Sequence, residues 1–221
     1  LLELFLRNVS VAYENVILHH EIEGSQRDML FMLVDSIETN SQETGQHVRR
    51  VAEYCRLIAS GIGLSEREVE IIEIASPLHD FGKIGIPDNI LHKPGKLDSE
   101  EWEVMKTHAR MGHELLNKSE REILKAAAVI AGQHHEHWNG NGYPDGLRGK
   151  QIHIYARIVA VADVFDALGS QRCYKEAWEI DEIIAYITEQ RGGQFDPELI
   201  DWVLTNIDSM KQVRVAYPDT A

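Results

Sequence analysis

A histidine and an aspartate stand side by side in residues 77–85, PLHDFGKIG. His79 offers a neutral imidazole nitrogen, and Asp80 offers two oxygens that can bridge two metal ions. Lys83 adds a cation that suits a phosphate group. A buried histidine beside a helix-capping aspartate would give the same dipeptide, so a metal site is predicted here only if other segments supply further ligands.

Glu43 and His47 are four residues apart on a predicted helix, so their side chains share one face and can converge on one ion. A solvated glutamate and histidine would show the same spacing. His108 is a single histidine near the end of a helix that includes Trp102, and a hydrogen-bonded, partly buried imidazole is the simpler explanation when it is taken alone. Neither motif by itself separates a metal site from an ordinary helix face.

His134 and His135 follow directly on the apolar run 126–131, AAAVIA. Desolvating two adjacent imidazole rings costs free energy unless each ring has a partner, and metal ligation would supply both partners. The neighbouring Glu136 and His137 do not complete the HExxH spacing of a zincin, so we expect them on the surface or behind the ligands.

Asp163 lies in residues 156–168, where the predicted helix is apolar on nearly all sides. Such a helix is normally buried, and a buried carboxylate is almost never left unpaired. The partner of Asp163 is predicted to be a metal ion or a basic group such as Arg157. A structural network of Arg157 with Asp166 fits the same pattern.

Helices joined by short polar interruptions must position these ligands, because no convincing period-two strand pattern is present. The predicted fold class is all-α. Two segments rich in glycine and proline, 81–97 and 139–146, directly follow ligand clusters and are predicted to be loops that wall the site. Residues 211–221 are expected to form an extended tail.

Apolar side chains recur at spacings of three and four in residues 1–23, which predicts an amphipathic helix. This helix either docks on its own domain or pairs with its copy in a second subunit. Gly24 and Ser25 interrupt the pattern. We therefore expect residues 1–25 to be a connector helix from a preceding domain and residues 26–221 to be the domain that holds the ligands.

The composition excludes several classes of function. A formal net charge of -14 over 221 residues argues against a partner that is a nucleic acid polymer. Cys55 and Cys173 form no CxxC pair and cannot define a disulfide framework, which favours a reducing compartment. No apolar run approaches the ~20 residues that span a bilayer, and no signal-peptide pattern opens the chain. We expect a cytoplasmic protein without a membrane span in this segment.

Taken together, the motifs from about residue 42 to residue 199 resemble the HD-GYP domains of the HD phosphohydrolase superfamily. The resemblance rests on Glu43-x-x-x-His47, His79-Asp80-x-Gly82-Lys83, His108, His134-His135, Gly142-Tyr143-Pro144 and Asp163. It implies an HD-type multi-helix bundle with a buried metal site. It also implies a phosphodiesterase that opens cyclic di-GMP to linear pGpG and, in some members, to GMP, by attack of a metal-bridged hydroxide on phosphorus.

By the same resemblance, the site holds two or three divalent transition-metal ions, most often iron, with manganese as the alternative. His79, Asp80 and Asp163 would form its centre. Asp80 would bridge to an ion held by His108, His134 and His135, while Glu43 and His47 would bind on the Asp163 side. The presence of Glu43 resembles the trinuclear type.

The resemblance also assigns substrate contacts. Lys83 would contact the scissile phosphate, and Arg172 and Lys175 would bind phosphate away from the metals. Gln171 and Cys173 depart from the usual Asp-Arg-Pro-Tyr-Lys pattern, which leaves the geometry of that loop open. Tyr143 is expected either to contact the substrate or only to shape its turn.

Two other functions fit the motifs. The domain either binds cyclic di-GMP without turnover, or docks a partner such as a diguanylate cyclase with a GGDEF domain. Alternatively, it is an HD-type hydrolase of another nucleotide or cyclic dinucleotide. The complete ligand set favours an active cyclic di-GMP phosphodiesterase, because a degenerate receptor usually lacks some of these residues.

Overall fold

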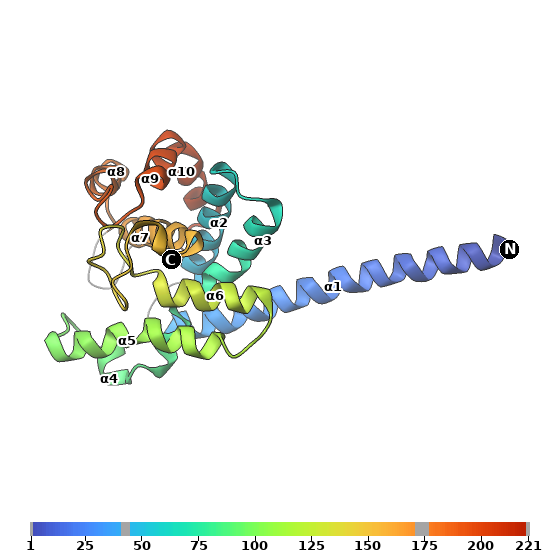
Figure 1. Cartoon of the computed structure of the whole chain (residues 1–221), viewed down its shortest axis with the longest axis horizontal. Coiled ribbons are helices and arrows are strands. Elements are labelled where there is room, and N and C mark those ends of the chain that lie inside the picture. The colour runs from blue at the N-terminus through green and yellow to red at the C-terminus, as the bar shows by residue number, and fades with distance from the viewer. Residues whose placement is uncertain (1, 41–44, 171–176, 220–221) are drawn as a thin grey trace.

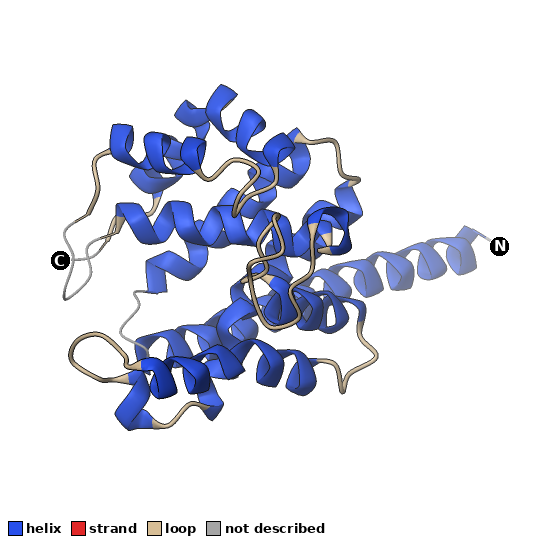
Figure 2. Ribbon diagram, turned by 60° about the vertical axis from the view of Figure 1, so that its left-hand side comes forward, coloured by secondary structure: helices blue, strands red, loops and turns tan. Residues whose placement is uncertain are grey.

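The computed structural model describes residues 2–40, 45–170 and 177–219. Its elements in chain order are α1 (Leu2–Asn40), α2 (Gly45–Gly61), α3 (Glu66–Ala75), the 3-10 helix η1 (Ser76–Gly85), α4 (Asp88–Leu91), α5 (Ser99–Leu116), α6 (Glu122–Gln133), the 3-10 helix η2 (Gly149–Gln151), α7 (Ile154–Gly169), α8 (Ile180–Glu189), α9 (Pro197–Thr205) and α10 (Ile207–Ala216). No named β-strand occurs within these ranges, which confirms the predicted all-α class (Figure 2).

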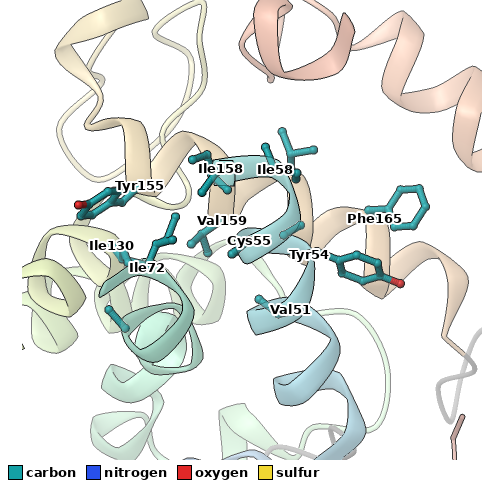
Figure 3. Close-up of a cluster of buried hydrophobic side chains, with 14 of the residues drawn as sticks. Val51, Tyr54, Cys55, Ile58, Ile72, Ile130, Tyr155, Ile158, Val159 and Phe165 are labelled. Atoms are coloured by element: carbon teal, nitrogen blue, oxygen red, sulfur yellow. The ribbon is translucent and has the colours of Figure 1, made fainter. Parts of the chain in front are cut away.

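Helices α2 and α7 form the centre of the hydrophobic core, with α3 and α6 beside them (Figure 3). The rings of Tyr54 and Phe165 meet edge to face with their centroids 5.3 Å apart. Ile58 of α2 and Ile158 of α7 are fully buried. Each such aliphatic side chain contributes about 1.5–3 kcal/mol by leaving water. This packing holds α2 and α7 in one fixed relation, which matters because each carries residues of the site.

Helix α1 extends away from the bundle for much of its length, while its C-terminal part packs on α2 and η1 (Figure 1). The helix runs without interruption through Gly24 and Ser25, so the break expected there from the sequence is wrong. A single glycine destabilises a long helix by only about 1 kcal/mol, and the hydrogen bonds of the neighbouring turns offset this cost.

Two helices begin at complete capping boxes. Ser65 accepts a hydrogen bond from the Glu68 amide in a complete capping box, and Asp98 does the same with Glu101. These caps fix where α3 and α5 begin. They thereby set the positions of η1 and of His108 relative to the core.

The segment 81–97 is not the continuous loop that its glycines and prolines predicted. The 3-10 helix η1 continues to Gly85, and α4 adds a short helix at Asp88–Leu91. Gly82 allows η1 to lie directly on α5, since a Cβ there would overlap the carbonyl of His108. Residues 139–146 do form a loop, as predicted.

Residues 211–216 are helical, because α10 continues to Ala216, so the extended conformation predicted for this part of residues 211–221 is wrong. No helix in the described ranges is both long and apolar enough to span a membrane.

Candidate metal centre

Seven of the eight predicted metal ligands gather in two groups inside the bundle. The Asp80 group consists of Asp80, His108, His134 and His135, and the Asp163 group consists of His47, His79 and Asp163. Within each group, one donor atom of every residue lies within 4.8 Å of the others. The Asp80 group draws on η1, α5 and the C-terminal end of α6, whereas the Asp163 group draws on α2, η1 and α7.

Asp80 lies between the two groups. Its Oδ1 is 3.2 Å from His108 Nε2 and 3.6 Å from His134 Nε2. Its Oδ2 is 3.4 Å from Nε2 of His79, a member of the other group. One carboxylate oxygen therefore faces each group, which is the arrangement that a bridging carboxylate requires.

Three of the histidines are oriented by nearby backbone carbonyls. Nδ1 of His79 is 2.9 Å from the Ser76 oxygen, Nδ1 of His108 is 2.7 Å from the Met105 oxygen, and Nδ1 of His134 is 3.0 Å from the Ala131 oxygen. A carbonyl oxygen can only accept a hydrogen bond, so Nδ1 carries the proton in each ring. In the neutral imidazole, Nε2 then offers its lone pair to the group.

Several polar atoms of the Asp80 group have no hydrogen bond from the described part of the chain. These buried atoms are Asp80 Oδ1, His108 Nε2 and His134 Nε2. Leaving a buried polar atom unsatisfied costs about 1–3 kcal/mol. A divalent cation would satisfy all three atoms at once, and imidazole with carboxylate is a donor set that transition metals accept. The residues therefore fit a bound metal ion.

Burial sets the protonation states of these ligands. It lowers the pKa of His134 and, more strongly, the pKa of His135, so both rings are neutral at pH 7. Burial also acts to raise the pKa of Asp80, but Lys83 and His79 outweigh it and hold this pKa well below its ordinary value. Neutral imidazoles beside an ionised carboxylate are the forms that bind a metal.

The Asp163 group is held by side chains from distant parts of the sequence. Asp163 Oδ1 lies 3.6 Å from His47 Nε2 and 3.9 Å from His79 Nε2. Nδ1 of His47 donates to Asp166 at 2.8 Å, which fixes its tautomer and aims Nε2 at Asp163. Burial acts to raise the pKa of Asp166, but its hydrogen bonds to His47 and Arg50 bring the net pKa below the ordinary value.

Arg157 is not the partner of Asp163. Its guanidinium pairs with Asp196 and donates to the Ile152 carbonyl, so the suggested network of Arg157 with Asp166 does not form. Asp166 pairs with Arg50 instead. Arg157 is therefore excluded as the partner of Asp163.

Comparison with known protein families matches residues 32–199 to a model described as HD domain. The chain belongs to the HD domain family. It is 44% identical over 219 residues to the 3'3'-cGAMP-specific phosphodiesterase 2 of Vibrio cholerae, covering 99% of this chain and 42% of that protein. It is 49% identical over 194 residues to the cyclic di-GMP phosphodiesterase response regulator RpfG of Xanthomonas campestris, covering 88% of this chain and 51% of that protein.

A solved structure described as an HDG"Y"P protein from Bdellovibrio bacteriovorus shares the fold, with a TM-score of 0.60 at 22% identity over 82% of this chain and 62% of that one. These findings confirm the HD-GYP assignment made from the sequence. The chain spans about half the length of the two curated relatives. Family and geometry together indicate a divalent-metal-binding site.

The Gly-Tyr-Pro tripeptide at residues 142–144 lies against the Asp80 group. The Tyr143 ring stacks on His135 with centroids 4.7 Å apart and an angle of 28°, and Lys106 Nζ lies 5.8 Å from the Tyr143 centroid. Burial raises the pKa of the Tyr143 hydroxyl, which stays neutral. Gly142 permits the close turn, since a Cβ there would overlap the backbone of residues 135–137.

Glu136 has a structural role that the sequence did not indicate. It is buried, and its two oxygens accept hydrogen bonds from the amides of Asp145 and Leu147. Burial raises the pKa of Glu136, although these amides oppose the shift. Glu136 therefore holds the loop that contains Gly142, Tyr143 and Pro144, and it does not lie on the surface.

Lys83 lies beside Asp80, with its Nζ 2.6 Å from Oδ2 and its side chain 13% exposed. The structure thus places this ammonium group next to the metal ligands, and its contact with the scissile phosphate stays a prediction. The remaining predicted residues, Glu43, Arg172 and Lys175, lie outside the described residues.

Sequence reasoning missed Arg50 altogether. Arg50 lies one helical turn after His47 on α2 and is buried, and it forms a two-pronged ion pair with Asp166 at 2.6 and 2.9 Å. The spacing of three residues from a predicted ligand was a usable signal, because residues at i and i+3 share a helix face.

Proposed function

We propose that this chain is a metal-dependent phosphodiesterase that hydrolyses cyclic di-GMP to linear pGpG and then to GMP. One observation carries the proposal: the two oxygens of Asp80 face two separate groups of imidazole and carboxylate donors. The cyclic di-GMP phosphodiesterase RpfG, at 49% identity, supports this choice of substrate.

The proposed ligands divide between at least two ions. Asp80, His108, His134 and His135 would hold one, and His47, His79 and Asp163 would hold another, with Asp80 shared between them. We propose iron, with manganese as the alternative, and a third ion that depends on Glu43. Bound divalent ions supply Lewis-acid activation of water and neutralise charge on the phosphoryl oxygens.

Lys83 and Asp80 are the residues proposed to act in the reaction itself. A cation at Asp80 Oδ2 would repel the nearby ammonium group of Lys83, so Lys83 must turn away from Oδ2 when metal binds. Its new partner is the scissile phosphate, whose negative charge it offsets as a mobile point charge. Tyr143, Arg172 and Lys175 are proposed to contact the rest of the substrate, Tyr143 through its ring beside His135.

A second substrate is supported by a specific observation. A 3'3'-cGAMP-specific phosphodiesterase is 44% identical over 99% of this chain. The two cyclic dinucleotides present the same phosphodiester to the metals, so the donor groups do not distinguish them. We therefore place 3'3'-cGAMP second among the candidate substrates.

The test is hydrolysis by anaerobically purified protein loaded with Fe²⁺ or Mn²⁺. Cyclic di-GMP, 3'3'-cGAMP and pGpG are offered separately, and products are identified by mass spectrometry. We expect cyclic di-GMP to give pGpG, Asp80→Asn to abolish the reaction, and Asp88→Asn, an exposed aspartate of α4, to leave it intact.

Binding of cyclic di-GMP without turnover would instead identify a receptor. Turnover of 3'3'-cGAMP or of another nucleotide alone would assign a different substrate. Either result contradicts the proposed reaction.

We also propose that α1 pairs with α1 of a second copy. Five exposed apolar side chains follow the a and d positions of one heptad repeat, at 50–64% exposure: Val11, Leu18, Ile22, Met29 and Met32. Asn15 falls at an a position between them, a placement that favours one register. A heterologous partner such as a GGDEF-domain protein is the alternative occupant of this face.

Sedimentation equilibrium tests the pairing. Leu18→Glu places a charge in the proposed interface and should shift a dimer to monomer. Ile17→Glu is the matched control, because Ile17 is exposed on the same helix but outside the a and d positions. A wild-type monomer at all concentrations would contradict self-association.

A further inference from the structure

Arg50 is a buried cation whose donors are fully used. A guanidinium has five N–H donors. In Arg50 they reach both Asp166 oxygens at 2.6 and 2.9 Å, the Ser170 hydroxyl at 2.9 Å, the Tyr217 carbonyl at 2.9 Å and the Asp219 carboxylate at 2.7 Å. The side chain of Arg50 is 2% exposed. It thus joins the metal side of the molecule to residues at the C-terminal end of the described chain.

The path from Arg50 to the Asp163 group has one intermediate residue. Asp166 receives the fork of Arg50 and, on Oδ2, the Nδ1–H of His47. The direction of His47 Nε2 toward Asp163 therefore depends on where Arg50 holds the Asp166 carboxylate. The three residues come from only two helices, α2 and α7.

The C-terminal tail, residues 217–219, closes the outer side of Arg50. The Asp219 side chain is 34% exposed, whereas Arg50 behind it is buried. Arg214 anchors the preceding α10 by donating to the carbonyl of Gly169, at the end of α7. Gly169 has no Cβ, and a Cβ there would overlap the Arg214 guanidinium. The tail is therefore fixed to the same end of α7 that carries Asp166.

We propose that the C-terminal tail positions the Asp163 group through Arg50. Arg50 is a positioning residue, because it reaches the metal site only through Asp166 and His47. With the tail in place, the Arg50 and Asp166 pair lies away from water, where an ion pair is strong and its geometry is well defined. Without the tail, water reaches the guanidinium, the fork loosens, and His47 loses its fixed direction.

This inference rests on the proposed metal site and is tested by metal affinity rather than by activity. Metal-free protein is titrated with Mn²⁺ against a chromophoric chelator, which resolves the dissociation constants of the two groups. His47→Ala identifies the constant that belongs to the Asp163 group. Far-UV circular dichroism checks that each variant is folded.

Deletion of residues 217–221 should raise the Mn²⁺ dissociation constant of the Asp163 group about 10-fold. This is the low end of the effect seen when a residue that orients a metal ligand is removed. Asp219→Asn should raise this dissociation constant by less than the deletion does, because Arg50 keeps its other partners. This variant keeps the inference testable if the deletion does not fold. The constant of the Asp80 group should stay unchanged in both. The matched control is Asp208→Asn, an exposed carboxylate of α10 paired with Lys211, which should change neither constant.

Two results would overturn the positioning role. Wild-type affinities in both tail variants would show that the tail does not act on His47, and equal weakening of both constants would show a general loss of structure. A wild-type chain that binds no Mn²⁺ and no Fe²⁺ would overturn the proposed function itself, and with it this inference, so the two failures are distinguishable.

Discussion

The Asp80 group and the Asp163 group reach the same kind of donor arrangement by different means. In the Asp80 group, His108 and His134 are oriented by carbonyls of their own helices, three residues before each ring. In the Asp163 group, His47 is oriented by Asp166, which lies 119 residues away in sequence. Local helix geometry therefore sets His108 and His134, as it does His79 of the other group, whereas the direction of His47 depends on how α2 and α7 pack.

Because of this difference, the two groups differ in their sensitivity to side-chain substitutions behind the ligands. A backbone carbonyl cannot be removed by a side-chain substitution, so His108 and His134 keep their orientation as long as α5 and α6 are helical. The carboxylate behind His47 can be removed, and it is itself held by a buried arginine. Asp80 belongs to both groups, and its replacement tests them together.

The largest expected effect is that of Asp80→Asn. Loss of the shared carboxylate should remove metal from both groups and lower kcat/KM by about 10⁴-fold or more, the scale seen when a group essential to the transition state is lost. The helical circular dichroism should be retained. Metal analysis and the hydrolysis assay check this, and retention of the full wild-type metal content would show that Asp80 does not bridge.

Single-histidine variants should separate the groups. His134→Ala should lose the ion of the Asp80 group and keep the other, and His47→Ala should do the reverse. Each variant should bind about one metal ion fewer than the wild type, because each group supplies its own imidazoles. Titration with Mn²⁺ measures the stoichiometry. Loss of every ion in either variant would mean that the groups are not independent.

Asp166→Asn tests the long-range support directly. The amide can still accept a hydrogen bond from His47 but no longer pairs with Arg50 as a carboxylate does, so the affinity of the Asp163 group should fall by about 10–100-fold. The Asp80 group should be unaffected. The chelator competition measures both constants, with Asp181→Asn, an exposed aspartate of α8, as the matched control.

The smallest expected effect is a pH dependence of the folding stability of the metal-free protein. Burial holds the pKa of His134 and of His135 below the ordinary value of 6.5. Between the folded and unfolded pKa values the unfolded chain binds more protons, so stability is present above about 6.5 and is lost as the pH falls below it. Denaturant unfolding from pH 7.5 to 5.5 measures how steeply the free energy of unfolding falls with pH. His134→Gln should make this fall less steep. An unchanged slope would contradict the neutral, buried ring.

Sequence patterns predicted the all-α class because the periodicity of apolar residues is a local signal. All seven residues that gather in the two groups were also among the predicted ligands. The helical turn at η1 was missed because Gly82 serves close packing on α5 rather than a loop. The partners of Arg50, Asp166 and Asp219, were missed because pairs 116 to 169 residues apart leave no local pattern.

The sharing of Asp80 is tested most directly by electron paramagnetic resonance of the Mn²⁺-loaded protein, combined with metal counting. Two donor groups joined by one carboxylate predict at least two ions per chain and a spectrum with exchange coupling between them, which Asp80→Asn removes. One ion per chain, or two ions with the spectrum of isolated Mn²⁺, would contradict the bridging role of Asp80.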